Sequence, residues 1–460
     1  MTAVAAFNSR ALLINRNSDL RDQRLALLLL IGLWILTRGL LFLLYSPLPA
    51  DDTGTYQRLA NQIANLDFHE YNGFRTPGYP LLILLAFNNN YIIWIMQSIL
   101  GLLISIVVFF IIRLHGMSVN WALAGAVLQL LALNEMFFEA FILTETLTAF
   151  LVVLVCYLFI YSAIYKSNWY SLAAVGMISA LLTLTRPQYL FIIPLFTLFI
   201  IIFFHSKRVS LLSIFLIFSL VPVLGWMSFN KEKTGYFTMS TWLGYHLTNH
   251  SGAFMEYAPD EYAVIRDIYL KYRKIKIAER GTHRMTFWLA RQELREATGL
   301  PEPQISHQFQ QLSMQLFVRF PLRYIASVTD AWLSFWVVPN YWHLENLKSQ
   351  TLADGLKIIW QGQQVLYRLF NLLFLIATVV LLWQLLRKRK PLQYNFVPLL
   401  LTMVILGTSV TQALTEYGEN GRYSIPTQPL VMAVVTLAIA GLANRKHNRE
   451  RPEQQLDDLK

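Results

Sequence analysis

The sequence has few of the residues on which soluble enzymes and disulfide-bonded proteins depend. Only 14% of its 460 residues are charged, and Cys156 is the single cysteine. One cysteine excludes an intramolecular disulfide and leaves the redox compartment open. The chain also lacks a GxxxxGKS loop and an HExxH pair. These absences argue against a nucleotide-sugar donor, ATP-driven pumping and a histidine metal site.

What the sequence has in abundance is apolar residues. They make up 55% of the chain, and its mean hydropathy is +0.43, the composition of a membrane protein. A hydrocarbon core about 30 Å thick needs roughly 20 apolar residues per helical span. We therefore predict an all-α, polytopic integral membrane protein with about ten transmembrane helices, at residues 25–45, 91–114, 120–140, 142–165, 169–185, 188–204, 209–229, 364–386, 395–413 and 425–443.

Lysine and arginine are unevenly distributed between the two sets of connections. With the N-terminus inside, the cytoplasmic segments carry seventeen of them, and the short outer loops carry four: Arg58, Arg75, Arg186 and Arg422. Cationic flanks are retained on the cytoplasmic side of a membrane, so this difference predicts the orientation. The formal net charge of +11 is then mostly a topology signal and a contact with anionic lipid, and no nucleic-acid partner is predicted.

The spans and loops predict five regions. The long outer segment carries amphipathic patterns such as "EYAVIRDIYLKYRKIKIAERG" and "RFPLRYIASVTDAWLSFWVVP", so we expect it to be mainly helical. The regions are a cytoplasmic segment at 1–24, a transmembrane core at 25–229 with its first outer loop at 46–90, the outer segment at 230–363, C-terminal transmembrane helices at 364–443 and a cytoplasmic tail at 444–460.

The first outer loop begins with two adjacent acids, Asp51 and Asp52, in "PADDTGTYQRLANQI". Carboxylates side by side repel each other unless cations are near, and Arg58 and Arg75 share this loop. Asp52 and Tyr56 are spaced i,i+4, which places them on one face of a helix that starts at the acidic pair. The alternative is that Asp52 is simply a helix N-cap.

The next motif, "GFRTPGYPLLILL" at 73–85, holds Arg75 beside two prolines and a glycine that stiffen the turn. A guanidinium held in one orientation suits a phosphate group. The loop thus combines a candidate base with a candidate phosphate ligand, next to aliphatic residues through which a long-chain lipid could reach them. This combination fits group transfer from a lipid phosphate.

These residues carry a resemblance to a known family. "DTGTY", "RTPGYP", "LTETL" and "LTRPQYLFIIPL", in this order and on one side of the membrane, resemble the C-type (GT-C) membrane glycosyltransferases, the group that includes protein O-mannosyltransferases and lipid A aminoarabinose transferases. "TGYFTMSTWLGYHL", "RFPLRY" and "GRYSIPTQP" add to it. The chain departs from the family in having "DD" where many members have Asp-Glu, and in having fewer spans than the aminoarabinose transferases.

The resemblance implies a GT-C-like fold with juxtamembrane helices in the first outer loop, and an enzyme that uses a polyprenyl-phosphate sugar donor. By the same resemblance, Asp52 is the catalytic base, Asp51 is the second candidate for that role, and Arg75 faces the donor phosphate. We expect an inverting single displacement, with the acceptor proton passing to Asp52. Acceptors of three kinds stay open: a glycolipid, a polysaccharide or a protein.

Other residues are weaker candidates for the same site. Arg186 and Arg422 are expected to contact phosphate, although Arg186 could snorkel to lipid headgroups and Arg422 could pair with Glu416 or Glu419. Arg38, inside the first span, needs a partner unless it also snorkels. The remaining candidates are Tyr56, Arg58, Glu145, Tyr245, which could pack against a sugar or isoprenoid, and His246, which as a surface or core histidine would have no such role.

Two other functional classes stay open. An O-antigen ligase or polymerase would also act on lipid-linked sugars at the outer face, and a secondary transporter would also need intramembrane charges. No metal site is predicted and no cofactor is certain, and a requirement for Mg²⁺ or Mn²⁺ is undecided. The expected location is the bacterial inner membrane, with the active site on its periplasmic face.

Overall fold

The computed structural model describes residues 16–165, 168–204, 208–338, 343–387 and 395–457. Within these ranges the chain is mostly helical, and its strand-type pairing is a single isolated bridge between Leu48 and Phe141. The all-α prediction is therefore confirmed. Residues 1–15 and 458–460 of the two predicted cytoplasmic ends lie outside the described residues, as do parts of the basic connections at 166–167, 205–207 and 388–394.

Each of the ten predicted spans coincides with a helix, but not all of these helices are long. Seven are long and apolar enough to cross a membrane, among the described residues. They are α2 (Arg16–Leu44), α5 (Asn90–Leu114), α8 (Glu145–Ile164), α11 (Arg208–Thr234), α17 (Gln350–Leu386), α18 (Phe396–Thr415) and the stretch Asn420–Asn444, which includes most of α20 (Gln428–Asp457). Three more are apolar but shorter: α6 (Val119–Leu130), α9 (Trp169–Thr185), and η1 (Pro187–Phe191) continued by α10 (Ile192–Phe203).

Several predicted boundaries differ from the observed ones; the first span, for example, begins at Arg16 and not at 25. The run 120–140 is interrupted after α6, and the chain forms the separate buried helix α7 (Leu133–Phe138), where "LNEMFFE" places two glutamates that need polar partners. Helix α17 begins fourteen residues before 364, because its polar first turns belong to the helix but not to the apolar run. Helix α20 continues to Asp457, into the region predicted as a solvated tail.

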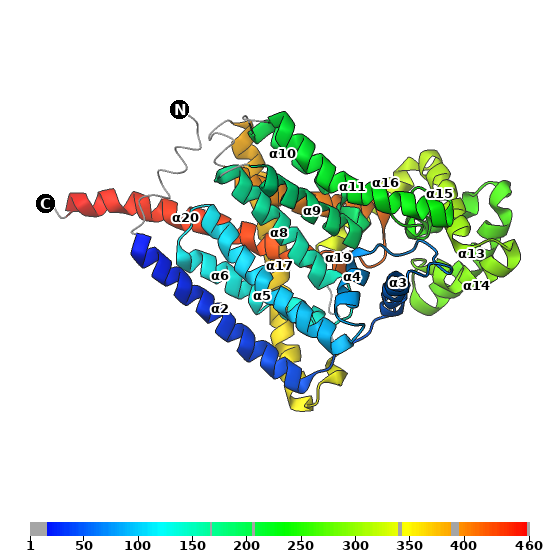
Figure 1. Cartoon of the computed structure of the whole chain (residues 1–460), viewed down its shortest axis with the longest axis horizontal. Coiled ribbons are helices and arrows are strands. Elements are labelled where there is room, and N and C mark those ends of the chain that lie inside the picture. Colours follow the sequence, from blue (N-terminus) through cyan, green and yellow to red (C-terminus); the bar gives the residue numbers. More distant parts are fainter. Residues whose placement is uncertain (1–15, 166–167, 205–207, 339–342, 388–394, 458–460) are drawn as a thin grey trace.

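The helices of the spans lie side by side in one bundle, and the helices between residues 243 and 335 gather at one end of it (Figure 1). Helices α3 (Thr53–Asn65) and α4 (Gly78–Leu85) form within the first outer loop, as predicted. The long outer segment is also mainly helical, as predicted. It contains α12 (Leu243–Ser251), α13 (Ala263–Arg280), α14 (Thr286–Thr298), α15 (Glu302–Arg319) and α16 (Pro321–Phe335), and the short α19 (Asn420–Tyr423) precedes α20.

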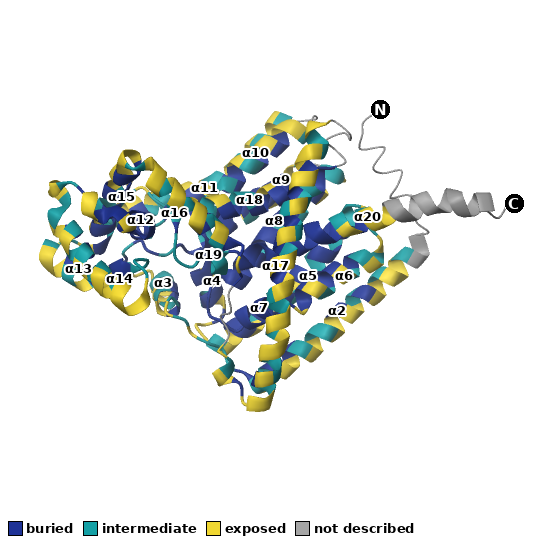
Figure 2. Ribbon diagram, turned by 180° about the vertical axis from the view of Figure 1, so that it is seen from behind, coloured by how far each residue is buried: buried dark blue, intermediate teal, exposed yellow. Residues whose placement is uncertain are grey.

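The two largest of four hydrophobic clusters among the described residues hold this arrangement together. The larger one runs through the bundle and includes Phe159, Phe196 and Phe396. The smaller one lies among α12 to α15 and includes Tyr245 and Phe309. Helices α2 and α17 expose many apolar side chains on the outside of the bundle (Figure 2), as lipid-facing helices do. Helices α12 to α16, which we call the outer helices, therefore have their own core beside the end of the membrane bundle.

Candidate functional site

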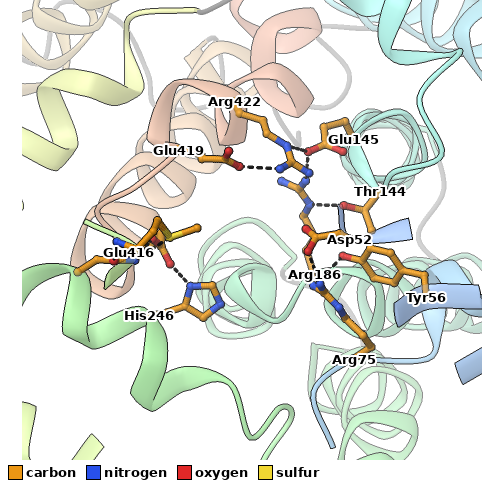
Figure 3. A network of polar contacts seen from close by, with 12 residues as sticks. Asp52, Tyr56, Arg75, Thr144, Glu145, Arg186, His246, Glu416, Glu419 and Arg422 are labelled. Atoms are coloured by element: carbon orange, nitrogen blue, oxygen red, sulfur yellow. Dashed lines mark hydrogen bonds and ion pairs between the residues drawn. The ribbon is translucent and has the colours of Figure 1, made fainter. Parts of the chain in front are cut away.

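A cavity of about 880 Å³ lies where the bundle meets the outer helices. Its walls come from the first outer loop, η1 and α10, α11, the segment that follows α11, and the turn between α18 and α20. One part of the wall is apolar and includes Leu190, Phe191, Pro194, Leu220 and Met227. The other part is polar and mostly charged, and it includes Asp52, Arg75, Arg186, His246, Glu416 and Arg422 (Figure 3).

Asp52 lies at the N-cap position of α3, but its side chain makes no capping hydrogen bond. Instead, Oδ1 accepts a hydrogen bond from Nη2 of Arg75 at 2.5 Å. Burial raises the pKa of this carboxyl, yet Arg75 and Arg422 outweigh burial and hold its pKa below the ordinary value. Asp52 is therefore an ionised carboxylate at the cavity wall, and the simple capping role is not what the structure shows.

Arg75 is held on several sides by the loop that carries it. Its Nε donates to Oγ1 of Thr55 at 2.8 Å, and its Nη1 donates to the hydroxyl of Tyr56 at 3.2 Å. The guanidinium also lies 4.4 Å from the ring centre of Tyr56 and 5.4 Å from that of Trp242. The first residues of α3 therefore fix the cation as well as supplying Asp52.

Glu145, the first residue of α8, is buried behind two arginines. Its Oε1 accepts from Nη2 of Arg186 at 2.5 Å and from Nε of Arg422 at 2.6 Å. Arg186 also donates to Oγ1 of Thr144 at 2.8 Å, and Arg422 donates to Glu419 at 2.6 Å. Both arginines line the cavity, whereas Glu145 does not. The carboxylate thus positions two guanidinium groups toward the cavity.

These contacts decide the two alternatives left by the sequence. Arg186 points into the protein and is only 6% exposed, so it does not snorkel to headgroups. Its Nη1 is buried and has no hydrogen-bond partner among the described residues. Arg422 does form a local ion pair, with Glu419 and not with Glu416, and it lines the cavity as well. A local salt bridge and a cavity role are therefore compatible.

His246 and Glu416 form a second polar pair on the opposite wall (Figure 3). Nδ1 of His246 contacts one oxygen of Glu416, and the other oxygen accepts from the amide of Asn249 at 2.5 Å. Burial and the charge of Arg75 lower the pKa of His246 to about 4, although Asp52 opposes this shift. The imidazole is therefore neutral at neutral pH, and a neutral ring that donates from Nδ1 to Glu416 has Nε2 available as an acceptor.

The structure brings seven of the ten predicted site residues together. Asp52, Tyr56, Arg75, Arg186, His246 and Arg422 line the cavity, and Glu145 lies directly behind two of them. The other three do not reach it. Asp51 and Arg58 are exposed, and Tyr245 is buried in the outer core, where it stacks on Phe287 and its hydroxyl donates to the carbonyl of Glu302.

The sequence indicates Glu416 only as a possible partner of Arg422 and does not predict its place in the cavity. The contact joins residues 170 positions apart in the sequence, and no local motif indicates it. Trp242, which precedes α12, also lines the cavity. The missed partner therefore depended on tertiary structure alone.

The carboxylates of the cavity are already engaged by basic or amide groups. Asp52 is paired with Arg75, and Glu416 is bound by His246 and Asn249. Among the described residues no group of three or more His, Cys, Asp or Glu side chains is arranged to hold a metal ion. We therefore derive no step through a metal, and the requirement for Mg²⁺ or Mn²⁺, which the sequence left undecided, is a question for experiment.

The sequence matches no protein-family model and has no significant match to a curated protein. Among solved structures, the chain is similar to ArnT from Cupriavidus metallidurans in the apo state, at 12% identity, covering 88% of this chain and 76% of that one, with a TM-score of 0.35. ArnT bound to undecaprenyl phosphate gives 14% identity, 88% and 77% coverage and a TM-score of 0.34. At these values the likeness is remote, so the function proposed below is based on the cavity and the sequence motifs.

Proposed function

We propose that this integral membrane protein is a glycosyltransferase of the GT-C type that moves a sugar from a polyprenyl-phosphate donor to an acceptor. The observation that carries the proposal is the cavity of about 880 Å³ in which Asp52 and three guanidinium groups face an apolar wall. The phosphate of such a donor matches the guanidinium groups, and its isoprenoid chain matches the apolar wall. The motifs around Asp52, Arg75, Glu145 and Arg186, which resemble those of the family, support the same function.

The donor phosphate is expected to lie among Arg75, Arg186 and Arg422. Arg186 has a free, buried Nη1, and Glu145 fixes both it and Arg422, so the guanidinium groups are arranged before the donor binds. The isoprenoid chain would follow the apolar wall formed by η1, α10 and α11. Preorganised cations in a partly dry site stabilise a developing phosphate charge more strongly than water does.

The reaction would be one in-line displacement at the anomeric carbon. The acceptor oxygen forms the new bond to that carbon as the bond to the phosphate oxygen breaks, and the polyprenyl phosphate leaves with the electron pair. The acceptor proton passes to the carboxylate of Asp52, which the nearby cations keep ionised. The product then has the inverted anomeric configuration.

His246 is a second proton acceptor in the same cavity. Its contact with Glu416 orients the ring, and a neutral imidazole takes up a proton when the adjacent carboxylate stabilises the imidazolium. The ion pair with Arg75 makes Asp52 a weaker base, which is the reason to test both residues. Loss of transfer in an Asp52 variant but not in a His246 variant would leave Asp52 as the base.

We assign transfer to the non-cytoplasmic side of the membrane, which in a bacterium is the periplasmic face of the inner membrane. The charged cavity lies at the ends of the helices that the lysine and arginine distribution predicts to be outside. This arrangement also favours an enzyme over a secondary transporter, whose charges would be expected near the midplane.

The proposal is tested with the purified protein and a panel of polyprenyl-phosphate sugars. Incubation with glycolipid, polysaccharide and peptide acceptors should give donor-dependent release of polyprenyl phosphate, together with a product of inverted configuration. Binding without cleavage of the sugar–phosphate bond would instead indicate a transporter. Retention of the donor configuration would reject the single displacement, and the absence of both binding and cleavage across the panel would reject the proposed function.

A further inference from the structure

A second cavity, of about 1200 Å³, lies beside the first and shares none of its lining residues. Its walls come from three parts of the chain: residues 69–72 of the first outer loop, residues 233–236 at the end of α11 and just after it, and residues 288–304 of α14, α15 and their connection. We call this cavity the outer groove. All three parts lie at or beyond the ends of the spans, so the groove is on the aqueous side of the site.

We call the first cavity, which contains Asp52 and Arg75, the reaction cavity. It is separated from the outer groove by two chain segments that are hydrogen-bonded to each other. The amide of Thr241 donates to the carbonyl of Gly73 at 3.0 Å, and its hydroxyl donates to the carbonyl of Asn72 at 2.8 Å. Gly73 has a φ of 74°, and a Cβ there would lie 2.7 Å from Cγ2 of Thr241. A glycine is therefore needed for the two segments to approach so closely.

Side chains of this partition alternate between the two cavities. Asn72 lines the groove and Phe74 lines the reaction cavity. Trp242 of the reaction cavity lies against Trp288 of the groove, with ring centres 5.1 Å apart. The guanidinium of Arg291 lies 5.7 Å from the ring of Trp288 and 5.9 Å from that of Phe74. One layer of aromatic side chains thus separates the outer groove from the reacting groups.

The charges of the groove balance one another. Its lining includes three cations of the Lys and Arg type, and three carboxylates. Arg291 is committed to Glu302, with Nη2 and Oε2 2.7 Å apart. A polyanion would therefore meet as many carboxylates as cations, and an apolar chain would strip water from all of them. The charged residues are Lys233, Arg291, Arg295, Glu70, Glu296 and Glu302.

A neutral saccharide fits the lining of the groove better than a polyanion or an apolar chain does. The apolar C–H face of a sugar ring packs against an indole, and Trp288 is 36% exposed at the groove. Sugar hydroxyls both donate and accept hydrogen bonds, as do the amides of Asn72, Gln292 and Gln304 around it. The groove thus offers an aromatic platform surrounded by groups that match hydroxyls.

We propose that the outer groove binds the carbohydrate part of the acceptor, so that the acceptor is a saccharide-bearing molecule. This inference rests on the proposed function, because it places the acceptor beside the donor phosphate site. Sugar units remote from the reacting one would occupy the groove, and the reacting unit would enter the reaction cavity with its attacking hydroxyl at Asp52. A peptide acceptor has no need of such a platform.

The test measures binding without any donor. Full-length wild-type protein in detergent is applied to an array of bacterial cell-envelope oligosaccharides, and it should retain at least one saccharide. Trp288→Ala should weaken retention about tenfold, whereas Leu289→Ala, an exposed neighbour on α14 outside the groove, should leave it unchanged. The double variant Gln292→Ala, Gln304→Ala should weaken it severalfold, and Gln311→Ala on α15 serves as its control.

Two outcomes would overturn the proposal: no saccharide retained by the wild type, or retention that neither groove variant weakens. If Trp288→Ala fails to fold, the double glutamine variant still decides the question, because both side chains are exposed. Since no donor is present, absence of transferase activity does not alter this readout. Saccharide binding without transfer from any donor would reject the proposed function alone.

Discussion

Arg38 in α2 and Arg186 before η1 are both almost completely buried, and each is paired with a glutamate that is also buried. Arg38 contacts Glu139 at 2.6 Å, and Arg186 contacts Glu145 at 2.5 Å. By charge, burial and distance these two pairs are nearly alike. They differ in what the remaining nitrogen atoms of each arginine meet.

Every nitrogen of the Arg38 guanidinium is used inside the protein. Nε and Nη2 contact the two oxygens of Glu139, and Nη1 donates to the carbonyl of Leu130 at 2.7 Å and to Thr37. Space for the carboxylate comes from Gly101, where a Cβ would lie 2.0 Å from Oε1 of Glu139. The pair does not line the reaction cavity or the outer groove, so it joins α2 to the end of α7.

The Arg186 pair is instead left incomplete and open. Nη1 of Arg186 and Oε2 of Glu145 have no hydrogen-bond partner among the described residues, and Arg186 lines the reaction cavity. A buried polar group without a hydrogen bond costs about 1–3 kcal/mol of stability unless a ligand supplies the missing partner. A buried ion pair is thus not by itself evidence of a site, whereas an unsatisfied cation facing a cavity is.

The largest effect should come from Asp52→Asn. Asparagine keeps the shape of the side chain but cannot accept the acceptor proton, so transfer should fall by about 10²–10⁴-fold. Stability should change little, because the carboxylate is partly exposed and its ion pair is correspondingly screened. Initial rates of polyprenyl phosphate release and the thermal unfolding midpoint check this. A variant with more than a third of wild-type turnover would contradict the assignment.

Arg38→Met should reduce the stability of the protein and leave its transfer activity unchanged. The change leaves Glu139 buried without its cation, which costs about 3–5 kcal/mol of unfolding free energy. Transfer per folded molecule should stay at the wild-type level, because the pair is remote from the reaction cavity. Adding Glu139→Leu should recover most of the lost stability. A folded, stable Arg38→Met protein with impaired transfer would remove the distinction between the two pairs.

Arg186→Met should reduce transfer by about 10²–10³-fold, the usual cost of removing one preorganised donor to a developing charge. Glu145 keeps its contact with Arg422 at 2.6 Å, so the variant should remain folded. The matched comparison is Arg38→Met, in which stability and not turnover is lost. Steady-state kinetics and unfolding midpoints for the two proteins are sufficient, and loss of folding in both would show that the pairs have the same role.

His246 should give a smaller, pH-dependent effect. Its pKa is about 4 in the folded protein against an ordinary 6.5, so the unfolded chain binds the proton first as the pH falls. The stability it contributes is fully present above pH 6.5 and is lost progressively toward pH 4. His250, whose pKa is also lowered to about 4, acts in the same range.

The variant His246→Gln isolates the first histidine, because His250 is present in both proteins. The thermal midpoint of the wild type should fall more than that of the variant between pH 7 and pH 4.5. Identical pH dependence in the two proteins would mean that the imidazole is not held neutral beside Arg75 and Glu416.

The smallest effects should come from Asp51→Asn and Arg58→Ala. Both side chains are exposed and lie outside the reaction cavity, so transfer should change less than about twofold and stability by no more than about 0.5 kcal/mol. The same assay as for Asp52→Asn provides the comparison. A large loss of transfer in Asp51→Asn would mean that the acidic pair acts as a unit.

Much of the fold was predictable, because apolar runs and basic flanks determine which segments span and which ends lie together. That reasoning placed Asp52, Arg75, Arg186 and Arg422 at one side of the membrane, although they are far apart in sequence. It could not separate Asp52 from Asp51 by residue type, because the direction of a side chain at a helix start depends on what Arg75 offers it. The family resemblance, and not the chemistry, had given Asp52 priority.

The remaining differences come from tertiary contacts that no local pattern encodes. The break after α6 follows from the need to bury Glu135 and Glu139 against Tyr367 and Arg38, which lie in other helices. Tyr245 has the aromatic character of a ligand platform, but its neighbours in the outer core decide that it packs internally. The sequence does not indicate which residue pairs with Arg38. The structure shows that its partner is Glu139, which lies 101 positions later.

The bond between Glu145 and Arg422 joins residues 277 positions apart. A nascent chain leaving the ribosome therefore inserts α2 through α18 before the second guanidinium of that carboxylate has been synthesised. A chain that ends before residue 415 also lacks Thr415, Glu416, Arg422 and Tyr423 of the cavity wall. Under the proposed function, a chain truncated before α19 should therefore insert into the membrane without transferring a sugar.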